Sequence, residues 1–534
     1  MGTLRTALFV ADSRGSFREL AEVARLLQAS GSWSCAICLA SHGIAGDDEL
    51  AACRSEGIAC VDMLGERYVP PSANGVTHPF LQTLVTRLLA GPRRAWQRLR
   101  ARLRPLVPES LVPPLRRVLA SRCVAALRRA ASHLERSAYH ALTRLVTPAT
   151  RDAVFLRLLR TSGIAWQIQR RSLVLRWSRA LTDRVRPALV VLCEDNVEGV
   201  SAPIVRAAHE ASAIVAIQPN TIATAAEPAE TYWGNPAHSL DRWSNRVVAR
   251  LYPRWVYTHR GRALLRLPAA GVLAAEWLGL APPLPWQINS GGADVILAES
   301  EAVRRYFARA GLPADRLRLT GTLAADRLAR GMAEAPRRRE RLRAALGFSG
   351  DRPVVLCALP PNQLDVRASA CCFARYEDLL AFWIETLAKS GECDVVLSLH
   401  PRSRRDPVRH FEGPRVRIAE EPVVDLIPAC DVFVASVSAT IRWAIACSKP
   451  VLNYDVYRYH YDDYSGVDGV VTIDDREEFA REAARMLTDP DHRARLARRQ
   501  AAAAADWGTL DGRAAERILA LFDEFTSKAA RRVE

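Results

Sequence analysis

Short apolar runs alternate with segments of helical periodicity along most of this 534-residue chain. At the start, TALFVAD predicts a strand, FRELAEVARLLQASG places its apolar residues at helical spacing, and WSCAICLA predicts a second strand. Alternating strands and helices form parallel sheets, because each helix carries the chain back across the sheet. Further strands are predicted in RPALVVLCEDN, SAIVAIQPN, ADVILAES and RPVVLCALPPNQ.

The strand and helix pattern predicts an α/β protein with two Rossmann-like parallel-sheet domains. A chain of 534 residues is long enough to bury two cores. We place the first domain at residues 1–330 and the second at 331–508, followed by a C-terminal helix at 509–534. The charged helical segment PRRRERLRAALGF lies near the junction, and a cleft is expected between the domains.

A basic helical insertion interrupts the first domain at residues 75–186. Between positions 81 and 186 there are 23 arginines and four acidic residues, and apolar stripes at helical spacing occur at 81–89 and 115–127. Such helices either pack on the first domain with solvated arginines or dock on an anionic membrane surface. Nucleic acid is not a predicted partner, because the basic charge is the only feature that would favour it and no nucleic-acid-binding motif accompanies that charge.

Composition and cysteine spacing indicate which ligands and which cellular compartment to expect. The net charge of +16 comes almost wholly from arginine, and guanidinium groups attract phosphate and anionic lipid. Among the 12 cysteines, Cys35 and Cys38 lie in a strand-like run without a second pair, so neither a metal site nor a cofactor is predicted. Scattered cysteines and the lack of a secretory signal favour a cytoplasmic protein, which the basic helices would hold at the inner face of the cell membrane if they dock.

Polar residues follow two strands of the predicted second domain. The run CDVVLSLHPRS ends in a His-Pro-Arg segment, and DVFVASVSATIRW changes from a strand into a serine-rich loop before a helix. Loops at the carboxyl ends of parallel strands hold phosphorylated ligands through backbone N–H groups and helix N-termini. The residues predicted to contact a nucleotide phosphate are His400, Pro401, Arg402, Ser436, Ser438 and Thr440. Strand-end capping by the histidine and helix capping by the hydroxyls remain the alternatives.

The order of these motifs resembles the GT-B glycosyltransferase superfamily. The segment ADVILAESEAV…GLPADRLRLTGTLAADRL is similar to one in non-hydrolysing UDP-N-acetylglucosamine 2-epimerases, where it leads into the hinge between the domains. The His-Pro pair and serine-rich loop resemble those of CDP-glycerol glycerophosphotransferases and capsule polysaccharide transferases. The resemblance implies that His400, Ser436, Ser438 and Thr440 contact the donor phosphates. Asn362 and Gln363, on the loop after the strand that ends near Ala358, are candidates for reading the base, and Thr322 is added as a further donor contact.

Two departures from the families limit what the resemblance implies. The epimerases continue their serine loop into a Gly-Gly and a Glu pair, whereas this chain has Ala439, Thr440, Ile441 and Arg442. The glycerophosphotransferases place a His-Gly where this chain has Gln218, Pro219 and Asn220. The first departure argues against epimerase activity, and the second leaves that position without a histidine base.

Transfer to a hydroxyl group requires a base on the other side of the cleft. Asp195 is the first candidate and Glu194 the second, because both follow a predicted strand. Adjacent side chains on an extended segment point in opposite directions, so only one of them is expected to enter the site. Asp12, in the first strand-to-helix turn, is the reserve candidate.

The predicted function is a glycosyltransferase-type transfer. A sugar or polyol phosphate would move from a nucleotide-activated donor to a surface polysaccharide or a lipid-linked acceptor, without a metal. The alternatives are a UDP-sugar 2-epimerase and a catalytically inactive GT-B scaffold in a polysaccharide assembly complex.

Overall fold

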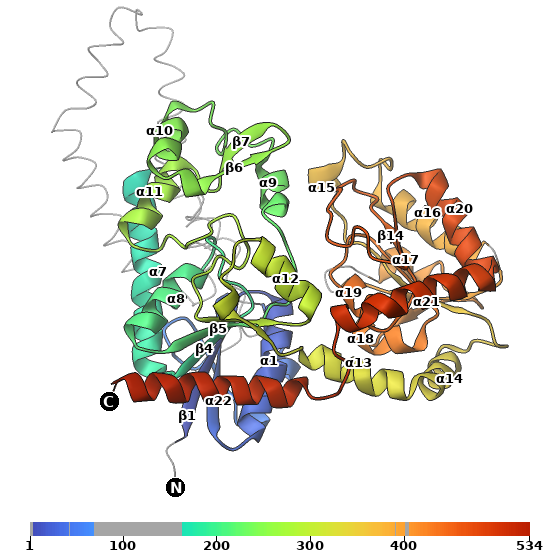
Figure 1. Cartoon of the computed structure of the whole chain (residues 1–534), viewed down its shortest axis with the longest axis horizontal. Coiled ribbons are helices and arrows are strands. Elements are labelled where there is room, and N and C mark those ends of the chain that lie inside the picture. The colour runs from blue at the N-terminus through green and yellow to red at the C-terminus, as the bar shows by residue number, and fades with distance from the viewer. Residues whose placement is uncertain (1–3, 42, 69–162, 390, 401–404, 534) are drawn as a thin grey trace, which may run out of the picture.

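The first domain is built on a seven-stranded parallel sheet and the second on a six-stranded parallel sheet. The two domains stand side by side in the computed structural model in Figure 1, which describes residues 4–41, 43–68, 163–389, 391–400 and 405–533. The predicted architecture of two Rossmann-like parallel-sheet domains is confirmed.

The first sheet has the strand order β3-β2-β1-β4-β5-β8-β9. Its strands are β1 (Arg5–Ala11), β2 (Trp33–Leu39), β3 (Ala59–Val61), β4 (Leu189–Leu192), β5 (Ile214–Ile217), β8 (Val295–Ala298) and β9 (Leu317–Leu319). The chain moves outward from β1 to β2 and β3, and then returns to place β4 on the other side of β1. Ligands bind at such a reversal, outside the carboxyl ends of the strands.

The helices of the first domain cover this sheet and form an additional layer beside it (Figure 1). They are α1 (Arg14–Ala29), α2 (Asp47–Ser55), α7 (Ile164–Val185), α8 (Ser201–Glu210), α9 (Ala226–Tyr232), α10 (Trp243–Leu251), α11 (Ala269–Trp277) and α12 (Glu301–Arg309). Helix α13 (Leu323–Ala333) follows β9 and lies beneath the second domain in Figure 1. An antiparallel hairpin of β6 (Val256–His259) and β7 (Arg262–Leu265) joins α9, α10 and α11 in the additional layer.

The second sheet has the strand order β12-β11-β10-β13-β14-β15 and reverses between β10 and β13. Its strands are β10 (Val354–Ala358), β11 (Asp394–Ser398), β12 (Val416–Ala419), β13 (Val432–Ala435), β14 (Val451–Tyr454) and β15 (Val470–Ile473). Its helices are α14 (Ala335–Leu346), α15 (Leu364–Arg367), α16 (Tyr376–Ala388), α17 (Asp406–Arg409), α18 (Val423–Leu426), α19 (Ile441–Ala446), α20 (Arg476–Thr488) and α21 (Pro490–Trp507). Each domain therefore has its own reversal at which a ligand can bind.

Helix α7 changes the predicted extent of the basic insertion. Residues 75–186 were expected to form a basic helical insertion in the first domain, and the last part of it, α7, packs against α8 and α11 and leads directly into β4. Its Val174 and Leu181 are buried in the core, and Arg179 pairs with Glu210 of α8 at 2.6 Å. This part of the predicted insertion is a crossover helix of the sheet. The stripes expected at 81–89 and 115–127 lie within residues 69–162, outside the described part of the chain.

The last helix of the chain, α22 (Ala514–Val533), returns to the first domain and lies beneath it in Figure 1. Asp326 of α13 accepts hydrogen bonds from the backbone N–H groups of Ala514 and Ala515, both at 2.9 Å. A carboxylate at this position caps the helix and interacts favourably with its dipole. Ile518 and Phe522 are fully buried in the core beside α1. The predicted C-terminal helix thus stabilises the first domain.

One cluster of buried apolar side chains continues from the first domain into the second. Leu328 of α13 and Phe307 of α12 belong to it, as do Ile427 and Phe433 of the second domain.

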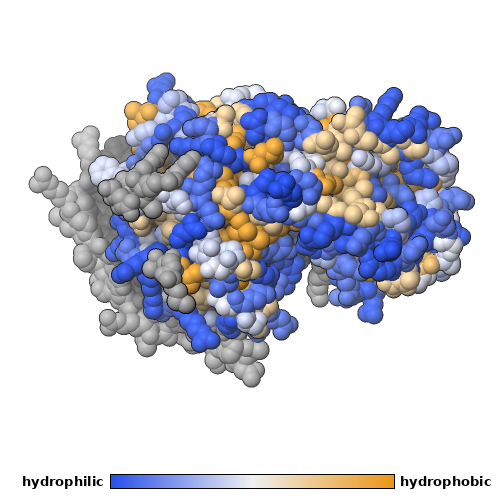
Figure 2. All heavy atoms as spheres, turned by 60° about the horizontal axis from the view of Figure 1, so that its bottom comes forward, coloured by the Kyte–Doolittle hydropathy of each residue, from blue (hydrophilic) through white to orange (hydrophobic). Residues whose placement is uncertain are grey.

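On the face shown in Figure 2, hydrophilic residues predominate and the outline of the molecule narrows between the two domains. None of the described helices has the length and apolar character needed to cross a bilayer.

Candidate functional site

A cleft of about 1460 Å³ lies between the carboxyl edges of the two sheets. Its first-domain wall comes from α1, α9 and the loops after β4 and β5. Its second-domain wall comes from the loops after β10, β11, β12 and β13. The cleft therefore brings together the ligand-binding edges of both domains.

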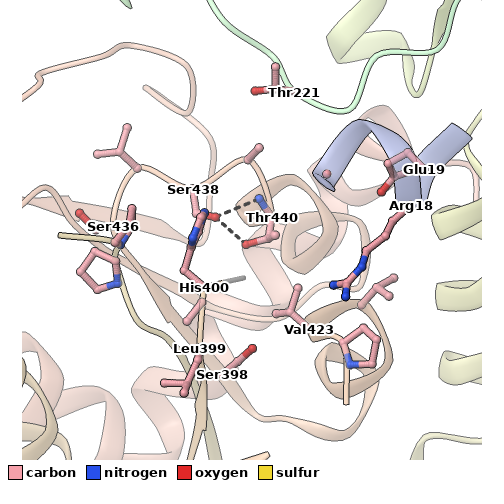
Figure 3. Close-up of a pocket in the computed structure, with 18 of the residues that line it drawn as sticks. Arg18, Glu19, Thr221, Ser398, Leu399, His400, Val423, Ser436, Ser438 and Thr440 are labelled. Carbon is pink, nitrogen blue, oxygen red and sulfur yellow. Dashed lines mark hydrogen bonds between the residues drawn. The ribbon is translucent and has the colours of Figure 1, made fainter. Parts of the chain in front are cut away.

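The second-domain wall of the cleft is rich in hydroxyl groups. Ser436, Ser438 and Thr440 line it together with His400, which follows β11 (Figure 3). The Ser438 and Thr440 hydroxyl oxygens are 2.8 Å apart, and Ser438 Oγ accepts the Thr440 backbone N–H at 3.3 Å. Four of the predicted donor contacts thus face the same cavity. The Ser438 contact goes to the residue just before α19, and within the described part of the chain no side-chain hydrogen bond caps the first turn of that helix, contrary to the alternative of helix capping.

The serine loop is held in a fixed conformation. Val437 has a φ angle of 43°, in the left-handed region that a β-branched residue adopts only at a cost of about 1–3 kcal/mol. Asn453 Oδ1 accepts the Val437 backbone N–H at 2.8 Å, and the Tyr464 hydroxyl donates to the Ser438 carbonyl at 2.9 Å. These two contacts from neighbouring segments offset the strain. The backbone of the loop is therefore held at both Val437 and Ser438.

The other predicted donor contacts are dispersed. Pro401 and Arg402 lie outside the described residues. Asn362 is exposed and its Oδ1 accepts the Leu364 backbone N–H at 3.1 Å; it does not belong to the cleft wall. Thr322 is buried as the N-cap of α13, where its hydroxyl accepts the Ala325 backbone N–H at 3.4 Å. The structure therefore does not bring Asn362 or Thr322 into the cleft.

Asp195 lies outside the cleft, contrary to the expectation that it borders it. Its buried carboxylate accepts backbone N–H groups from Ser290, from Gly292 at 2.7 Å and from Ala293 at 3.0 Å. A Cβ atom at Gly292 would lie 3.1 Å from Asp195 Oδ2, so a larger residue there would push the carboxylate away by a few tenths of an ångström. Burial raises the pKa of Asp195, and the hydrogen bonds oppose that rise. A carboxylate engaged in this way holds the loop before β8 and is not available to a ligand in the cleft.

Glu194 and Asp12 lie close to each other at the carboxyl ends of β4 and β1 but are not part of the cleft wall. Burial, together with the nearby Asp12 carboxylate, raises the pKa of Glu194 to about 7. Asn196 Nδ2 donates to Glu194 Oε1 at 2.6 Å, and Asn196 itself lines the cleft. The Asp12 carboxylate accepts the Ser16 hydroxyl at 2.9 Å in the first turn of α1.

Two carboxylates of the first-domain wall were missed by sequence reasoning. Burial and the nearby Asp463 and Glu194 carboxylates raise the pKa of Glu227, in α9, to about 7. Burial and the Glu22 carboxylate raise the pKa of Glu19, in α1, to about 7 against the opposing charge of Arg442. Figure 3 shows Glu19 across the pocket from the serine loop. The local sequence around each residue is equally compatible with an exposed glutamate on a helix, so it does not identify either one as a cleft residue.

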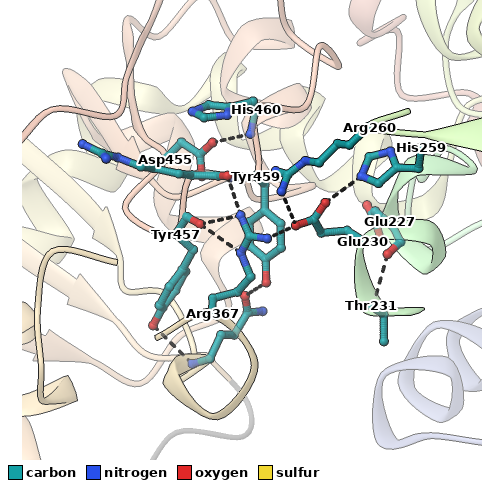
Figure 4. A network of polar contacts seen from close by, with 12 residues as sticks. Glu227, Glu230, Thr231, His259, Arg260, Arg367, Asp455, Tyr457, Tyr459 and His460 are labelled. Carbon is teal, nitrogen blue, oxygen red and sulfur yellow. Dashed lines mark hydrogen bonds and ion pairs between the residues drawn. The ribbon is translucent and has the colours of Figure 1, made fainter. Parts of the chain in front are cut away.

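Helix α9 is also tied to the second domain across the cleft (Figure 4). The Arg367 guanidinium, from α15, contacts the Glu230 carboxylate and donates to the Tyr457 carbonyl at 2.9 and 3.0 Å. Glu230 is also 2.6 Å from His259 Nε2 and 3.2 Å from Arg260 Nη1. Burial raises the pKa of Glu230, but His259 and the two arginines outweigh it and leave the pKa below its ordinary value.

A second link between the domains lies behind the serine loop. Arg442 Nε in α19 donates to the Glu299 carboxylate after β8, and both side chains are buried. Trp443 Nε1 donates to the other Glu299 oxygen at 2.8 Å, and Arg442 Nη1 donates to the Ala439 carbonyl at 3.1 Å. Arg442 therefore couples the loop to the first domain.

Comparisons with solved structures give distant likenesses. UDP-GlcNAc 2-epimerase from Neisseria meningitidis bound to UDP-GlcNAc is 11% identical, with 97% of this chain and 100% of that chain covered and a TM-score of 0.47. HepE from Anabaena in complex with UDP-glucose is 12% identical, with 98% and 100% covered and a TM-score of 0.42. A variant of the wall teichoic acid polymerase TagF is 12% identical, with 66% and 77% covered and a TM-score of 0.40. No protein-family model and no curated protein sequence matches the chain.

Proposed function

We propose that this chain is a transferase that moves a sugar or polyol phosphate from a nucleotide-activated donor to a polysaccharide or lipid-linked acceptor. The observation that carries the proposal is the chemical difference between the two walls of the cleft. A cluster of hydroxyl groups with an imidazole lies on the second-domain wall, and two carboxylates with a pKa of about 7 lie on the first-domain wall, which also carries arginines.

The second-domain wall suits the leaving nucleotide. Negative charge builds up on the departing phosphate oxygen as its bond to the transferred group breaks. Ser436, Ser438 and Thr440 offer hydroxyl donors from an ordered loop, and His400 adds an imidazole that becomes cationic when protonated. Donors that are already in place stabilise the developing charge without reorganisation.

The first-domain wall suits activation of the acceptor. Attack by an acceptor hydroxyl releases a proton, and a base works best when its pKa is close to the working pH. We assign this role to Glu227, because the described neighbours that shift its pKa are carboxylates and no cation holds its charge. Glu19 has a similar pKa but shares its surroundings with Arg442 and Arg327.

A panel of nucleotides tests the proposal. In a thermal-shift titration with CMP, CDP, UDP and GDP, at least one nucleotide is expected to raise the melting temperature in a saturable way, because a ligand that binds only the folded state stabilises it. A protein that binds none of the four would instead be an inactive scaffold. Formation of a C2 epimer from a UDP-sugar without any acceptor would establish the epimerase alternative.

A further inference from the structure

Helix α10 presents an exposed apolar stripe on the outer face of the first domain. Trp243, Val247 and Leu251 are 73%, 47% and 62% exposed, and they follow one another at intervals of four residues. Residues at this spacing lie on the same face of a helix. Trp277, at the end of the neighbouring helix α11, is 79% exposed. Exposed tryptophans beside an apolar stripe are uncommon on a surface that contacts only water.

The exposure does not come from a loosely attached helix. On the opposite face of α10, Asn245 Nδ2 donates to the carbonyls of Ala237 and Ser239, both at 2.8 Å, and Asn245 Oδ1 accepts the Ala269 backbone N–H at 3.0 Å. Val248, one turn from Asn245, is buried with Trp255. The helix is therefore fixed by one face, and the other face is available for contact.

Three arginines run parallel to the apolar stripe. Arg242, Arg246 and Arg250 are exposed, and each one directly precedes a residue of the stripe. Within the part of the chain that the structure describes, none of the three forms an ion pair with a carboxylate. The stripe thus lies beside exposed guanidinium groups, of which Arg246 is near the Asp241 carboxylate without forming an ion pair with it.

We propose that α10 is a membrane-docking surface for bilayers that contain anionic lipid. Leucine, valine and tryptophan side chains would enter the boundary between headgroups and acyl chains, and the arginines would reach the lipid phosphates beside them. The exposed guanidinium groups favour a phosphate-bearing surface over an uncharged apolar partner. Apolar burial and charge attraction both contribute to the binding free energy, so binding depends on the apolar stripe and on the row of arginines beside it.

Docking at α10 would place the cleft near the bilayer, and this consequence rests on the proposed function. Val248 of α10 and Leu265 of the hairpin belong to one buried cluster, and Leu264 of the hairpin belongs to a second cluster with Ala229 of α9. Helix α9 in turn contributes Tyr232 to the cleft wall. A packed layer thus joins the docking face to the cleft, where a lipid-linked acceptor would have to arrive.

Flotation of the full chain with vesicles tests the docking surface. Binding is expected to vesicles of phosphatidylcholine with phosphatidylglycerol, and the triple variant Trp243→Asn, Val247→Asn, Leu251→Asn is expected to bind about tenfold less. The triple variant Arg242→Gln, Arg246→Gln, Arg250→Gln is expected to lose its preference for the anionic vesicles. The single variant Leu251→Asn, which is least able to disturb folding, is expected to bind about threefold less.

The control makes the same change of charge on the other domain. Arg495, Arg498 and Arg499 are exposed on α21, and their triple change to glutamine is expected to leave binding unchanged. Wild-type binding by the α10 variants would overturn the inference, and would show that other parts of the chain or a soluble partner account for any membrane attachment. Nucleotide binding is measured in parallel: flotation lost with nucleotide binding kept supports the surface, and flotation without nucleotide binding defeats only the proposed function.

Discussion

Arg442 of the second domain and Glu299 of the first form a buried ion pair directly behind the serine loop. The pair joins the two walls of the cleft at a point where neither side chain can exchange its partner for water. Because Arg442 also donates to the Ala439 carbonyl, the position of the loop depends on contact between the domains.

Breaking this pair is expected to destabilise the whole molecule. Arg442→Ala leaves the Glu299 carboxylate buried without its cation, and the expected loss in the free energy of unfolding is about 3–5 kcal/mol. Denaturant unfolding measures it, with Arg481→Ala as the control, since the Arg481–Glu477 pair on α20 is exposed and its loss is expected to cost about 0–1 kcal/mol. Equal losses in the two variants would contradict the assignment.

His400→Ala is expected to weaken binding of the donor nucleotide about tenfold without unfolding the protein, because one donor of the phosphate site is removed. Titration of the nucleotide that gives the largest thermal shift measures the change. His410→Ala is the matched control, because His410 is exposed in the same domain and does not belong to the cleft wall. Unchanged affinity in His400→Ala would remove the imidazole from the phosphate site.

The pH dependence of turnover is expected to report Glu227. Its pKa of about 7 means that the ionised form, which accepts the proton, increases as the pH rises through neutrality. The ratio kcat/KM should therefore rise with pH below 7 and level off above it. In Glu227→Gln this rise should disappear, with a loss in turnover of about 100-fold or more.

Glu19→Gln and Glu194→Gln serve as controls for that experiment. Both side chains also have a pKa of about 7, but the acceptor is not expected to transfer its proton to them, so the rise with pH should remain in both variants. In Glu194→Gln the rise should shift to lower pH, because the Glu194 carboxylate helps to raise the pKa of Glu227. Loss of the pH-dependent limb in one of these two variants, and not in Glu227→Gln, would move the base to that residue.

Asp195→Asn is expected to affect stability more than chemistry. An asparagine cannot reproduce a carboxylate that accepts three backbone N–H groups, and the expected loss is about 2–4 kcal/mol in the free energy of unfolding. Turnover of the folded variant should stay within about twofold of wild type. Asp351→Asn, at a highly exposed position, should change neither quantity. A large loss of turnover with unchanged stability would restore Asp195 as the base.

The sequence determined the two parallel sheets and the chemistry of one wall of the cleft. Apolar runs that end in His400 and in Ser436 predict where strands stop, and the carboxyl ends of parallel strands share one edge for topological reasons. Ser438 and Thr440 follow the same strand, so their place in the cleft is a local property of the chain.

The tertiary structure alone decided the opposite wall and the links across the cleft. A sequence of extended residues does not say which side chain points inward, and Asp195 turns toward the loop before β8 instead of the cleft. Glu227 acquires a raised pKa only because distant segments bury it and bring Asp463 and Glu194 near. The pairs of Arg442 with Glu299 and of Arg367 with Glu230 join residues far apart in the chain, and long-range packing fixes such pairs without leaving a local pattern.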